Sequence, residues 1–429
     1  MIGPGVEREP LSAVDAAWLR MDSPQSPMVI AAALEFDGPM DREALAGVLA
    51  ERLVGRRRFR QRVAMERVTP WPRWEIDPRF DLRAHLHHVA LPAPGGHAAL
   101  AALASDLVST PLDYSKPLWQ VHLVDGAAGG SAVVVRLHHC IADGVSLVRL
   151  LLDLADGAGG EGVPREVGQL RDARLDRRDR LARLRRLVAE ARSAAHLIAL
   201  SRDARTPLSG EQGTRKRVAW SNPIAFDELV AAAREAGGTV NDVLLSALAG
   251  ALRHHLESLH AWHEGLEVRA VEPVNLRPGE GAADQLGNRF GLVYVPLPLG
   301  IAEPRRRLRE VRRRTDALKR SEDASASLGL VGALGLVTAG AERLGVDWFS
   351  RKATLLATNV AGPPAPISIA GRPLRRLVVW APMSGEIALA FSFLSYAGTI
   401  TVALRCDEGV VPDPDAMVRD VEAEIAVLR

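Results

Sequence analysis

The sequence has little cysteine, few aromatic residues and no excess of charge of either sign. Two cysteines, Cys140 and Cys406, are too few for a disulfide framework or a four-thiolate metal site, which indicates a reducing compartment. Aromatic residues occupy 4% of the 429 positions, too few for a nucleic-acid surface built from stacked rings. The 54 Lys and Arg against 52 Asp and Glu create no broad field for a polyanion. We therefore expect no nucleic-acid partner.

A secretion signal and a clear membrane span are also missing. Residues 1–10 do not follow the order of basic, apolar and small residues that marks a signal peptide. The uncharged run 324–341 is about as long as the shortest helix that crosses a bilayer, but it contains four glycines. We expect this run to form a buried or surface-lying helix. The predicted location is the cytoplasm, with any contact with a membrane or lipid droplet being peripheral.

What is present is typical of a globular protein of two or three domains, with 47% hydrophobic and 25% charged residues. Strand-like and helix-like segments mix along the chain, without a glycine fingerprint for a nucleotide. Between residues 165 and 205 there are 12 arginines and six acidic residues, with apolar side chains at helical spacing over 181–200. The prediction is an α/β fold with an N-terminal half over 1–164, a basic helical linker over 165–215 and a C-terminal half over 216–429.

The densest group of reactive side chains is His138-His139-Cys140-Ile141-Ala142-Asp143-Gly144. It follows an apolar strand and precedes a helix, a place where α/β proteins bind ligands. An imidazole there suits general-base catalysis near pH 7, and Gly144 permits a tight backbone where the helix begins. His138 and His139 are adjacent, whereas metal-binding histidines on one helix face are four residues apart, so no metal site is predicted. Composition alone is equally compatible with two histidines that only cap the strand.

Further motifs give this segment a family context. His138, His139, Asp143 and Gly144 match the HHxxxDG pattern of the coenzyme A-dependent acyltransferase superfamily, which includes chloramphenicol acetyltransferase and peptide-synthetase condensation domains. The whole chain resembles the bacterial wax ester synthase/acyl-CoA:diacylglycerol acyltransferase family. The other matching segments are, in chain order, 10–19, Pro117-Leu118-Trp119, Asn241-Asp242, 273–277, Leu286-Gly287-Asn288 and 358–363. Thr358 and Ala361 stand where that family more usually has Ser and Pro.

The resemblance implies two chloramphenicol acetyltransferase-like halves joined by the basic linker, with the active site in the crevice between them. It implies an O-acyltransferase that moves a long-chain acyl group directly from acyl-CoA to the hydroxyl of diacylglycerol, of a long-chain alcohol, or of both. No cofactor is expected to be bound permanently. His139 is the implied general base. His138, Asp143 and Gly144 shape the motif, with Arg277 as the partner of Asp143.

Roles for other segments stay open. Asn241 can stabilise the developing oxyanion or orient the base, or it can be the N-cap of a helix over 242–256. Pro117, Leu118 and Trp119 are expected to contact substrate. The arginine clusters 56–58, 305–307 and 312–314 could meet the phosphates of coenzyme A, although runs of charge usually form solvated faces, so none is assigned.

Two alternative functions share the same fold. One is a condensation-type acyltransferase that uses carrier-bound acyl groups, which is disfavoured because no carrier domain adjoins these motifs. The other is a non-catalytic lipid-droplet-binding protein, which the intact HHxxxDG pattern disfavours.

Overall fold

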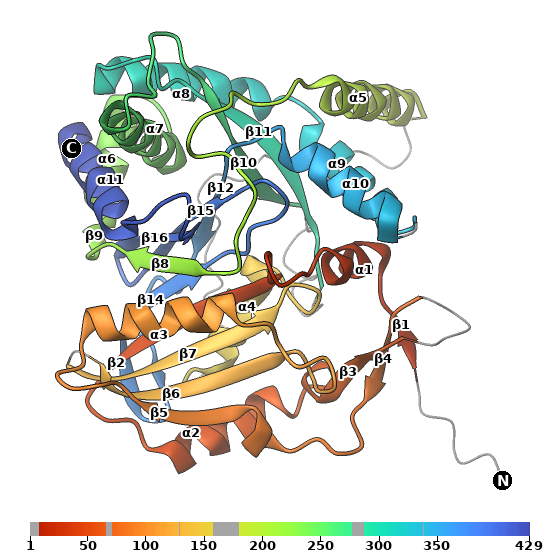
Figure 1. Ribbon diagram of the computed structural model, residues 1–429, viewed down its shortest axis with the longest axis vertical. Coiled ribbons are helices and arrows are strands. Elements are labelled where there is room, and N and C mark those ends of the chain that lie inside the picture. The colour runs from red at the N-terminus through yellow and green to blue at the C-terminus, as the bar shows by residue number, and fades with distance from the viewer. Residues whose placement is uncertain (1–7, 66–70, 128, 158–179, 277–286, 338) are drawn as a thin grey trace.

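Two large mixed sheets lie one above the other in the computed structural model, each with helices packed on it (Figure 1). The structure describes residues 8–65, 71–127, 129–157, 180–276, 287–337 and 339–429. Contacts of one C-terminal strand with both sheets hold the layers together. The predicted α/β class is confirmed.

The sheet that we call the N-terminal sheet has six strands. Their order is β13 (Ser368–Ile369), β14 (Arg372–Trp380), β2 (Val29–Asp37), β7 (Gly130–His138), β6 (Trp119–Ala127) and β5 (Leu86–Ala90). The helices of this half are α1 (Ala13–Arg20), α2 (Arg42–Val48), α3 (His97–Ser109) and α4 (Gly144–Leu154), with short helical turns at Leu49–Leu53, Arg57–Arg60 and Leu82–Ala84. A small sheet of β1 (Glu9–Pro10), β4 (Arg73–Ile76) and β3 (Gln61–Ala64) lies beside it.

The other large sheet, the C-terminal sheet, has seven strands. Their order is β11 (Phe290–Leu297), β10 (Val268–Asn275), β12 (Leu355–Ala361), β15 (Leu389–Tyr396), β16 (Thr399–Asp407) and β8 (Lys216–Trp220), with β9 (Ile224–Ala225) also paired to β16. The helices of this half are α6 (Phe226–Glu235), α7 (Val240–Ser258), α8 (Pro304–Leu318), α11 (Pro414–Leu428), α5 (Arg180–Ala199), α9 (Asp323–Leu334) and α10 (Ala339–Ser350).

The C-terminal half of the chain contributes β13 and β14 to the N-terminal sheet. β14 comes from the C-terminal half of the sequence but pairs antiparallel with β2, with Trp380 opposite Ala31 and Val378 opposite Ala33. β2 is therefore a central strand, and its first eight residues are buried. A strand covered on both faces reads as a continuous apolar run, as Met28 to Leu34 does. Because β14 also contacts β15 and β16, it packs the two sheets against each other.

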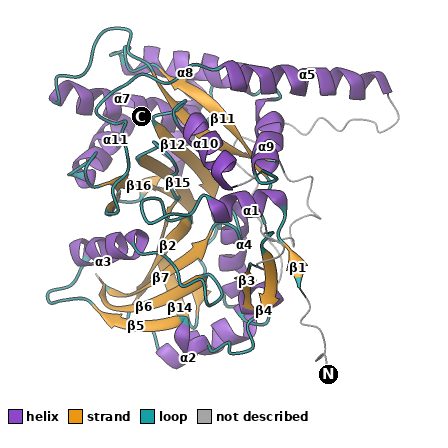
Figure 2. Cartoon of the chain, turned by 45° about the vertical axis from the view of Figure 1, so that its right-hand side comes forward, coloured by secondary structure: helices purple, strands orange, loops and turns teal. Residues whose placement is uncertain are grey.

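The basic linker and the uncharged run both form helices. α5 coincides within one residue with the predicted helix over 181–200, and the preceding residues 158–179 lie outside the described part of the chain. Figure 2 shows α5 projecting past α9 at one edge of the molecule. The run 324–341 contributes to two helices, α9 and α10, instead of one. Among the described residues, no helix has the length and apolar character needed to cross a bilayer.

The arginine clusters make contacts within the protein. Arg307 on α8 is fully buried and pairs with Glu424 of α11. Arg314 pairs with Glu310 and Glu267. In the N-terminal half, Arg56 pairs with Asp153. These ion pairs account for part of the clusters that the sequence alone leaves unassigned.

Candidate active site

The HHxxxDG segment connects the end of β7 to the start of α4, as predicted. The His139 backbone N–H donates to the Met28 carbonyl at 2.8 Å, and that of His138 donates to the Leu118 carbonyl at 3.0 Å. Asp143 is the N-cap of α4, where one carboxylate oxygen accepts from the backbone N–H of Ser146 at 3.0 Å and from its hydroxyl at 2.9 Å. The loop is thus fixed at both ends.

His138 faces the protein interior. It is fully buried, and its Nδ1 accepts a hydrogen bond from the Cys140 backbone N–H at 3.1 Å. Its Nε2 lies 3.3 Å from the Tyr114 hydroxyl and 3.8 Å from an Asp22 carboxylate oxygen. Because Nδ1 accepts, the proton of the neutral ring is on Nε2. His138 therefore supports the loop from behind.

His139 faces the cavity between the two sheets. Its ring stacks on the indole of Trp18 from α1, with centroids 4.3 Å apart and planes at 14°. Burial lowers the pKa of His139 to about 4, and the nearby negative charge of Asp143 opposes this effect only in part. No other described residue makes a well-aligned hydrogen bond to its buried Nδ1. His139 is consequently a neutral imidazole at pH 7, able to accept a proton.

A segment from the other half closes over the motif. The Asn288 side-chain amide donates to the His139 carbonyl at 2.7 Å and to an Asp15 carboxylate oxygen at 2.8 Å. The Arg289 backbone N–H donates to the second carboxylate oxygen of Asp143 at 3.3 Å. Asp15, Trp18 and Asn288 were not predicted as site residues. The only sequence signal for them is that each lies in a segment that carries the family resemblance.

The cavity, which we call the central cavity, measures about 290 Å³ and opens where two strands of the C-terminal sheet separate. β10 and β12 pair only at Ala270–Leu355 and Val271–Leu356. Beyond this point, residues 272–275 and 358–361 line the cavity instead of bonding to each other. Gly144 lies against this opening, because a Cβ placed on it would be 3.4 Å from the Val360 side chain.

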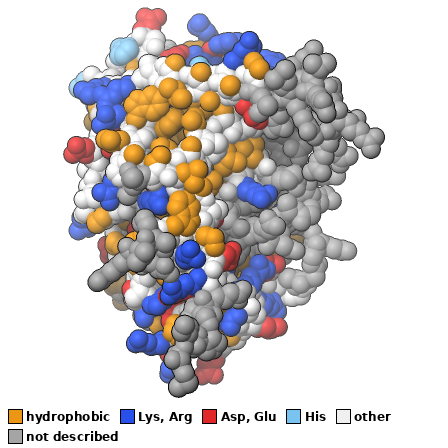
Figure 3. All heavy atoms as spheres, turned by 90° about the vertical axis from the view of Figure 1, so that its right-hand side faces the viewer, with side chains coloured by type: hydrophobic (Ala, Val, Ile, Leu, Met, Phe, Trp, Pro, Cys, Tyr) orange, Lys and Arg blue, Asp and Glu red, His pale blue; other side chains and the backbone are white. Residues whose placement is uncertain are grey.

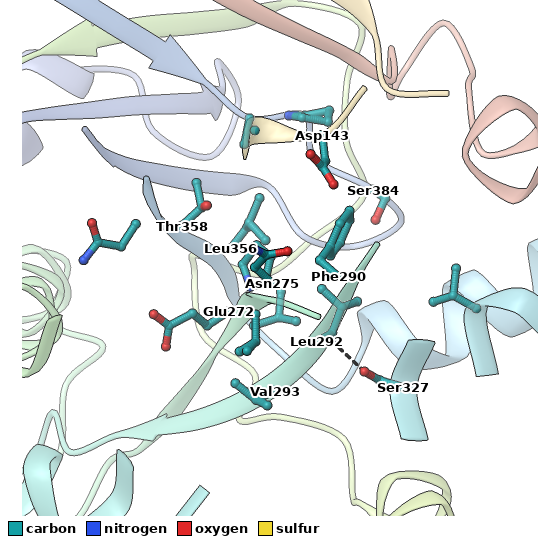
Figure 4. Close-up of a pocket in the computed structure, with 18 of the residues that line it drawn as sticks. Asp143, Glu272, Asn275, Phe290, Leu292, Val293, Ser327, Leu356, Thr358 and Ser384 are labelled. Carbon is teal, nitrogen blue, oxygen red and sulfur yellow. Dashed lines mark hydrogen bonds between the residues drawn. The ribbon is translucent and has the colours of Figure 1, made fainter. Parts of the chain in front are cut away.

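The gap gives the cavity an arm on each face of the sheet (Figure 4). Ala270 and Val293 pack on the α7 and α8 side, whereas Val271 and Tyr294 pack on the α5 and α9 side. The arm on the α7 and α8 side, which we call the polar arm, contains the polar side chains of Thr239, Asn241, Glu272, Thr315 and Lys319 among the apolar Phe226, Val240, Val274, Val293, Val295 and Leu318. The apolar arm, on the second side, is lined by Val271, Leu292, Tyr294, Leu330, Leu334, Phe349 and Leu356.

Asn241 lies in the polar arm. The interpretation of Asn241 as an N-cap is wrong, because α7 begins at Val240 and Thr239 is the N-cap in a capping box with Asp242. The Asn241 side-chain oxygen accepts from the Asn359 amide at 3.2 Å. Among the described residues no hydrogen bond joins Asn241 to His139, although both line the cavity. The role of Asn241 in orienting the base or stabilising the oxyanion stays a prediction.

The remaining predicted residues lie elsewhere. Leu118 and Trp119 are fully buried, and the Trp119 indole N–H donates to the Phe59 carbonyl at 2.8 Å. Pro117, Leu118 and Trp119 are not among the residues that line the central cavity, and Leu118 and Trp119 pack in the core of the N-terminal half. Contact of this segment with substrate stays a prediction. Arg277 lies outside the described residues.

The described residues give no support for a metal ion or a cysteine nucleophile at this site. In the described residues, no three His, Cys, Asp or Glu side chains come together as metal ligands would. Cys140 is fully buried, and burial raises the pKa of its thiol well above the usual value. A thiol with a raised pKa is a poor nucleophile at pH 7. The geometry therefore offers a neutral imidazole beside a two-armed cavity.

Two family models and several relatives match this chain. Residues 11–182 match the model for the wax ester synthase/diacylglycerol acyltransferase catalytic domain, and residues 286–429 match that for the WS/DGAT C-terminal domain. A Mycobacterium tuberculosis protein named a probable diacylglycerol O-acyltransferase is 29% identical, over 97% of this chain and 95% of its own length. Another relative from that organism, also named for this activity, is 32% identical over 69% of each chain.

The fold is shared with a solved structure. The wax ester synthase/diacylglycerol acyltransferase from Marinobacter aquaeolei VT8 superposes with a TM-score of 0.72 over 98% of both chains, at 22% identity. The predicted two-half acyltransferase fold is thereby confirmed. With its HHxxxDG loop, its two matched domains and its full-length relatives, this chain belongs to the wax ester synthase/diacylglycerol acyltransferase family and is an O-acyltransferase.

Proposed function

We propose that the protein moves a long-chain acyl group from acyl-CoA to the hydroxyl of diacylglycerol, of a long-chain alcohol, or of both. The observation that carries this proposal is the neutral imidazole of His139 at the wall of a largely apolar cavity. A buried base with a low pKa stays unprotonated at pH 7 and can take the proton of an alcohol. An apolar wall suits substrates made mostly of methylene groups.

In the proposed reaction His139 takes the hydroxyl proton as the acceptor oxygen attacks the thioester carbon. The new C–O bond forms, the C–S bond breaks, and the proton then passes from His139 to the departing thiolate, giving the ester and free coenzyme A. No acyl-enzyme is formed. The buried Cys140 thiol, with its raised pKa, supports direct attack over transfer through cysteine.

Support for the His139 side chain comes from its surroundings. Trp18 stacks on one face of the imidazole, and Asn288 fixes the backbone carbonyl of His139. Asp143 lies close enough for its charge to favour the imidazolium that forms during the reaction. Proton transfer to a positioned base of this kind is typically worth about 10² to 10⁴ in rate.

The test uses purified protein with palmitoyl-CoA and either dioleoylglycerol or hexadecanol. Release of coenzyme A is followed with a thiol reagent, and the product lipid is separated by thin-layer chromatography. We expect triacylglycerol, wax ester or both to form in step with coenzyme A. If neither acceptor is esterified while a carrier-bound acyl group is transferred, the condensation-type alternative replaces this proposal.

The proposed acceptors are apolar molecules that partition into membranes and lipid droplets, and one face of the protein is suited to contact a lipid surface. Apolar side chains gather over α9 and α10 in Figure 3, and Leu336 and Leu344 are 68% and 73% exposed. The same two helices supply Leu334 and Phe349 to the apolar arm. The same two helices therefore carry exposed apolar side chains on the outside and cavity-lining side chains on the inside. We propose that the exposed side chains around Leu336 and Leu344, which we call the α9–α10 patch, contact a lipid surface from which acyl chains enter the cavity.

A further inference from the structure

A carboxyl group that the proposed reaction does not use lies in the wall of the central cavity. Glu272 is on β10, opposite Val293 of β11, on the face of the sheet that points to α7 and α8. Figure 4 shows its carboxylate pointing away from Phe290 and Leu292, into the polar arm. Its side chain is only partly accessible, and it lines the cavity.

The side chains around Glu272 hold it without neutralising it. The Asn241 amide lies close enough to the Glu272 carboxylate to lower its pKa as a donor, and the Asn241 side-chain oxygen accepts from the Asn359 amide at 3.2 Å. The positive charge of Lys319 lowers the pKa of Glu272, but the Lys319 ammonium group forms its ion pair with Asp316, at 3.2 Å. In the described ranges, no lysine or arginine is recorded in an ion pair with Glu272.

The neighbouring carboxylate of Asp242 already accepts hydrogen bonds at both of its oxygens. One carboxylate oxygen of Asp242 accepts from the Thr239 backbone N–H at 2.7 Å and from its hydroxyl at 2.8 Å. The other accepts from the Thr315 hydroxyl at 2.6 Å. Asp242 thus fixes the start of α7 to α8, while the Glu272 carboxylate has acceptor capacity left for a group in the cavity.

The electrostatic setting explains why a ligand would be favoured there. Burial, with a smaller contribution from the negative charge of Asp242, raises the pKa of Glu272 to about 7 against the opposing effects of Asn241 and Lys319. A buried carboxylate with few donors is costly, and each further N–H or O–H donor that reaches it lowers that cost.

We propose that Glu272, held by Asn241 and Asn359, accepts a hydrogen bond from an O–H or N–H group of a substrate in the polar arm. This inference rests on the proposed function. Among the substrates of that reaction, acyl-CoA supplies such groups through the amide N–H groups of its pantetheine arm. Diacylglycerol and a simple long-chain alcohol have only the hydroxyl that reacts, so an acceptor supplies the donor only if it carries a second hydroxyl. The polar arm is thus a specificity site that a plain hydrocarbon chain does not satisfy.

Steady-state kinetics of Glu272→Gln and Glu272→Met test the site. KM is measured for palmitoyl-CoA, for hexadecanol and for 1,2-hexadecanediol, with Glu43→Gln as a control because Glu43 is exposed on α2. We expect KM to rise about tenfold either for palmitoyl-CoA or for the diol alone, with kcat within twofold of wild type. A rise for palmitoyl-CoA assigns the donor to pantetheine, and a rise for the diol assigns it to the acceptor.

Wild-type protein gives a readout that needs no substitution. As pH falls from 8 to 6, Glu272 becomes protonated and is a weaker acceptor, so KM for the same substrate rises. His139 stays neutral over this range, and the change disappears in Glu272→Gln. If wild type esterifies its substrates but none of these KM values moves by more than twofold, the inference is wrong. If wild type esterifies nothing, the proposed function itself has failed.

Discussion

The indole ring of Trp18 lies flat against the imidazole of His139, 4.3 Å away, and so separates the base from water. Desolvation is the main reason that the pKa of His139 is lowered to about 4. We predict that Trp18→Ala moves the acid limb of the kcat against pH profile upward, from about 4 toward the ordinary histidine value. Rates measured from pH 4 to 8 check this. Trp18→Phe keeps a ring in place and should shift the limb less, and an unmoved limb in Trp18→Ala contradicts the assignment.

The same low pKa predicts how stability depends on pH. The unfolded chain binds a proton at His139 once pH falls through the ordinary histidine value, whereas the folded protein does so only near pH 4. His139 therefore favours the folded state at neutral pH and loses this contribution between about pH 6.5 and 4. Urea unfolding at pH 7 and pH 5 should show a smaller loss of stability for His139→Gln than for wild type. Equal losses in the two proteins would mean that His139 titrates normally.

Asn288 joins the motif loop to α1, so its removal should affect both stability and rate. Asn288→Ala leaves the partly buried Asp15 carboxylate and the His139 carbonyl without this donor, which costs about 1–3 kcal/mol of unfolding free energy. We expect kcat to fall as well, because the base loses its support. Urea denaturation and steady-state rates measure the two effects. Asn222→Ala, at an exposed position, is the matched control and should change neither.

The α9–α10 patch gives a prediction that depends on how the acceptor is presented. The double variant Leu336→Ser/Leu344→Ser should bind phosphatidylcholine vesicles more weakly in co-sedimentation and show a higher KM for dioleoylglycerol in vesicles. Its rate on a short, water-soluble alcohol should stay unchanged, because that acceptor needs no surface. Val427→Ser removes an apolar side chain that is 62% exposed on α11 and is the control. If the double variant binds vesicles as strongly as wild type, the patch does not contact lipid. If the double variant changes its oligomeric state instead, the patch is an interface between copies of the protein.

Local sequence features predicted the local parts of the site well. The apolar strand before His138, the glycine after Asp143 and the helix that follows are all short-range signals, and the structure has them at the expected places. The helix over 181–200 was equally readable from its spacing of apolar residues. Motif order along the chain then indicated the family.

Long-range pairing accounts for what the sequence did not reveal. β14 completes the N-terminal sheet through pairs about 340 residues apart, and no local pattern specifies such a partner. Trp18 and Asn288 reach His139 only because α1 and the start of β11 meet at the motif loop. Glu272 reads as one polar residue in a strand, and its position in the cavity depends on β10 separating from β12.

Trp119 shows that a residue within a family motif can lie in the core. Its large apolar ring is buried against Phe59 and His85, with ring centroids 6.0 Å and 4.4 Å away. Matching a family motif does not distinguish a residue that holds the fold from one that touches substrate. Burial and hydrogen-bond partners make that distinction, and both require the structure.

The central claim is that neutral His139 is the general base of an O-acyl transfer. The most direct test is the rate of coenzyme A release from palmitoyl-CoA at pH 7.5, measured for wild type and His139→Ala with whichever acceptor the wild type esterifies. Circular dichroism and thermal unfolding establish that the variant is folded. The account predicts a fall of about 10² to 10⁴ in kcat for the folded variant. A folded His139→Ala protein that retains the wild-type rate would contradict it.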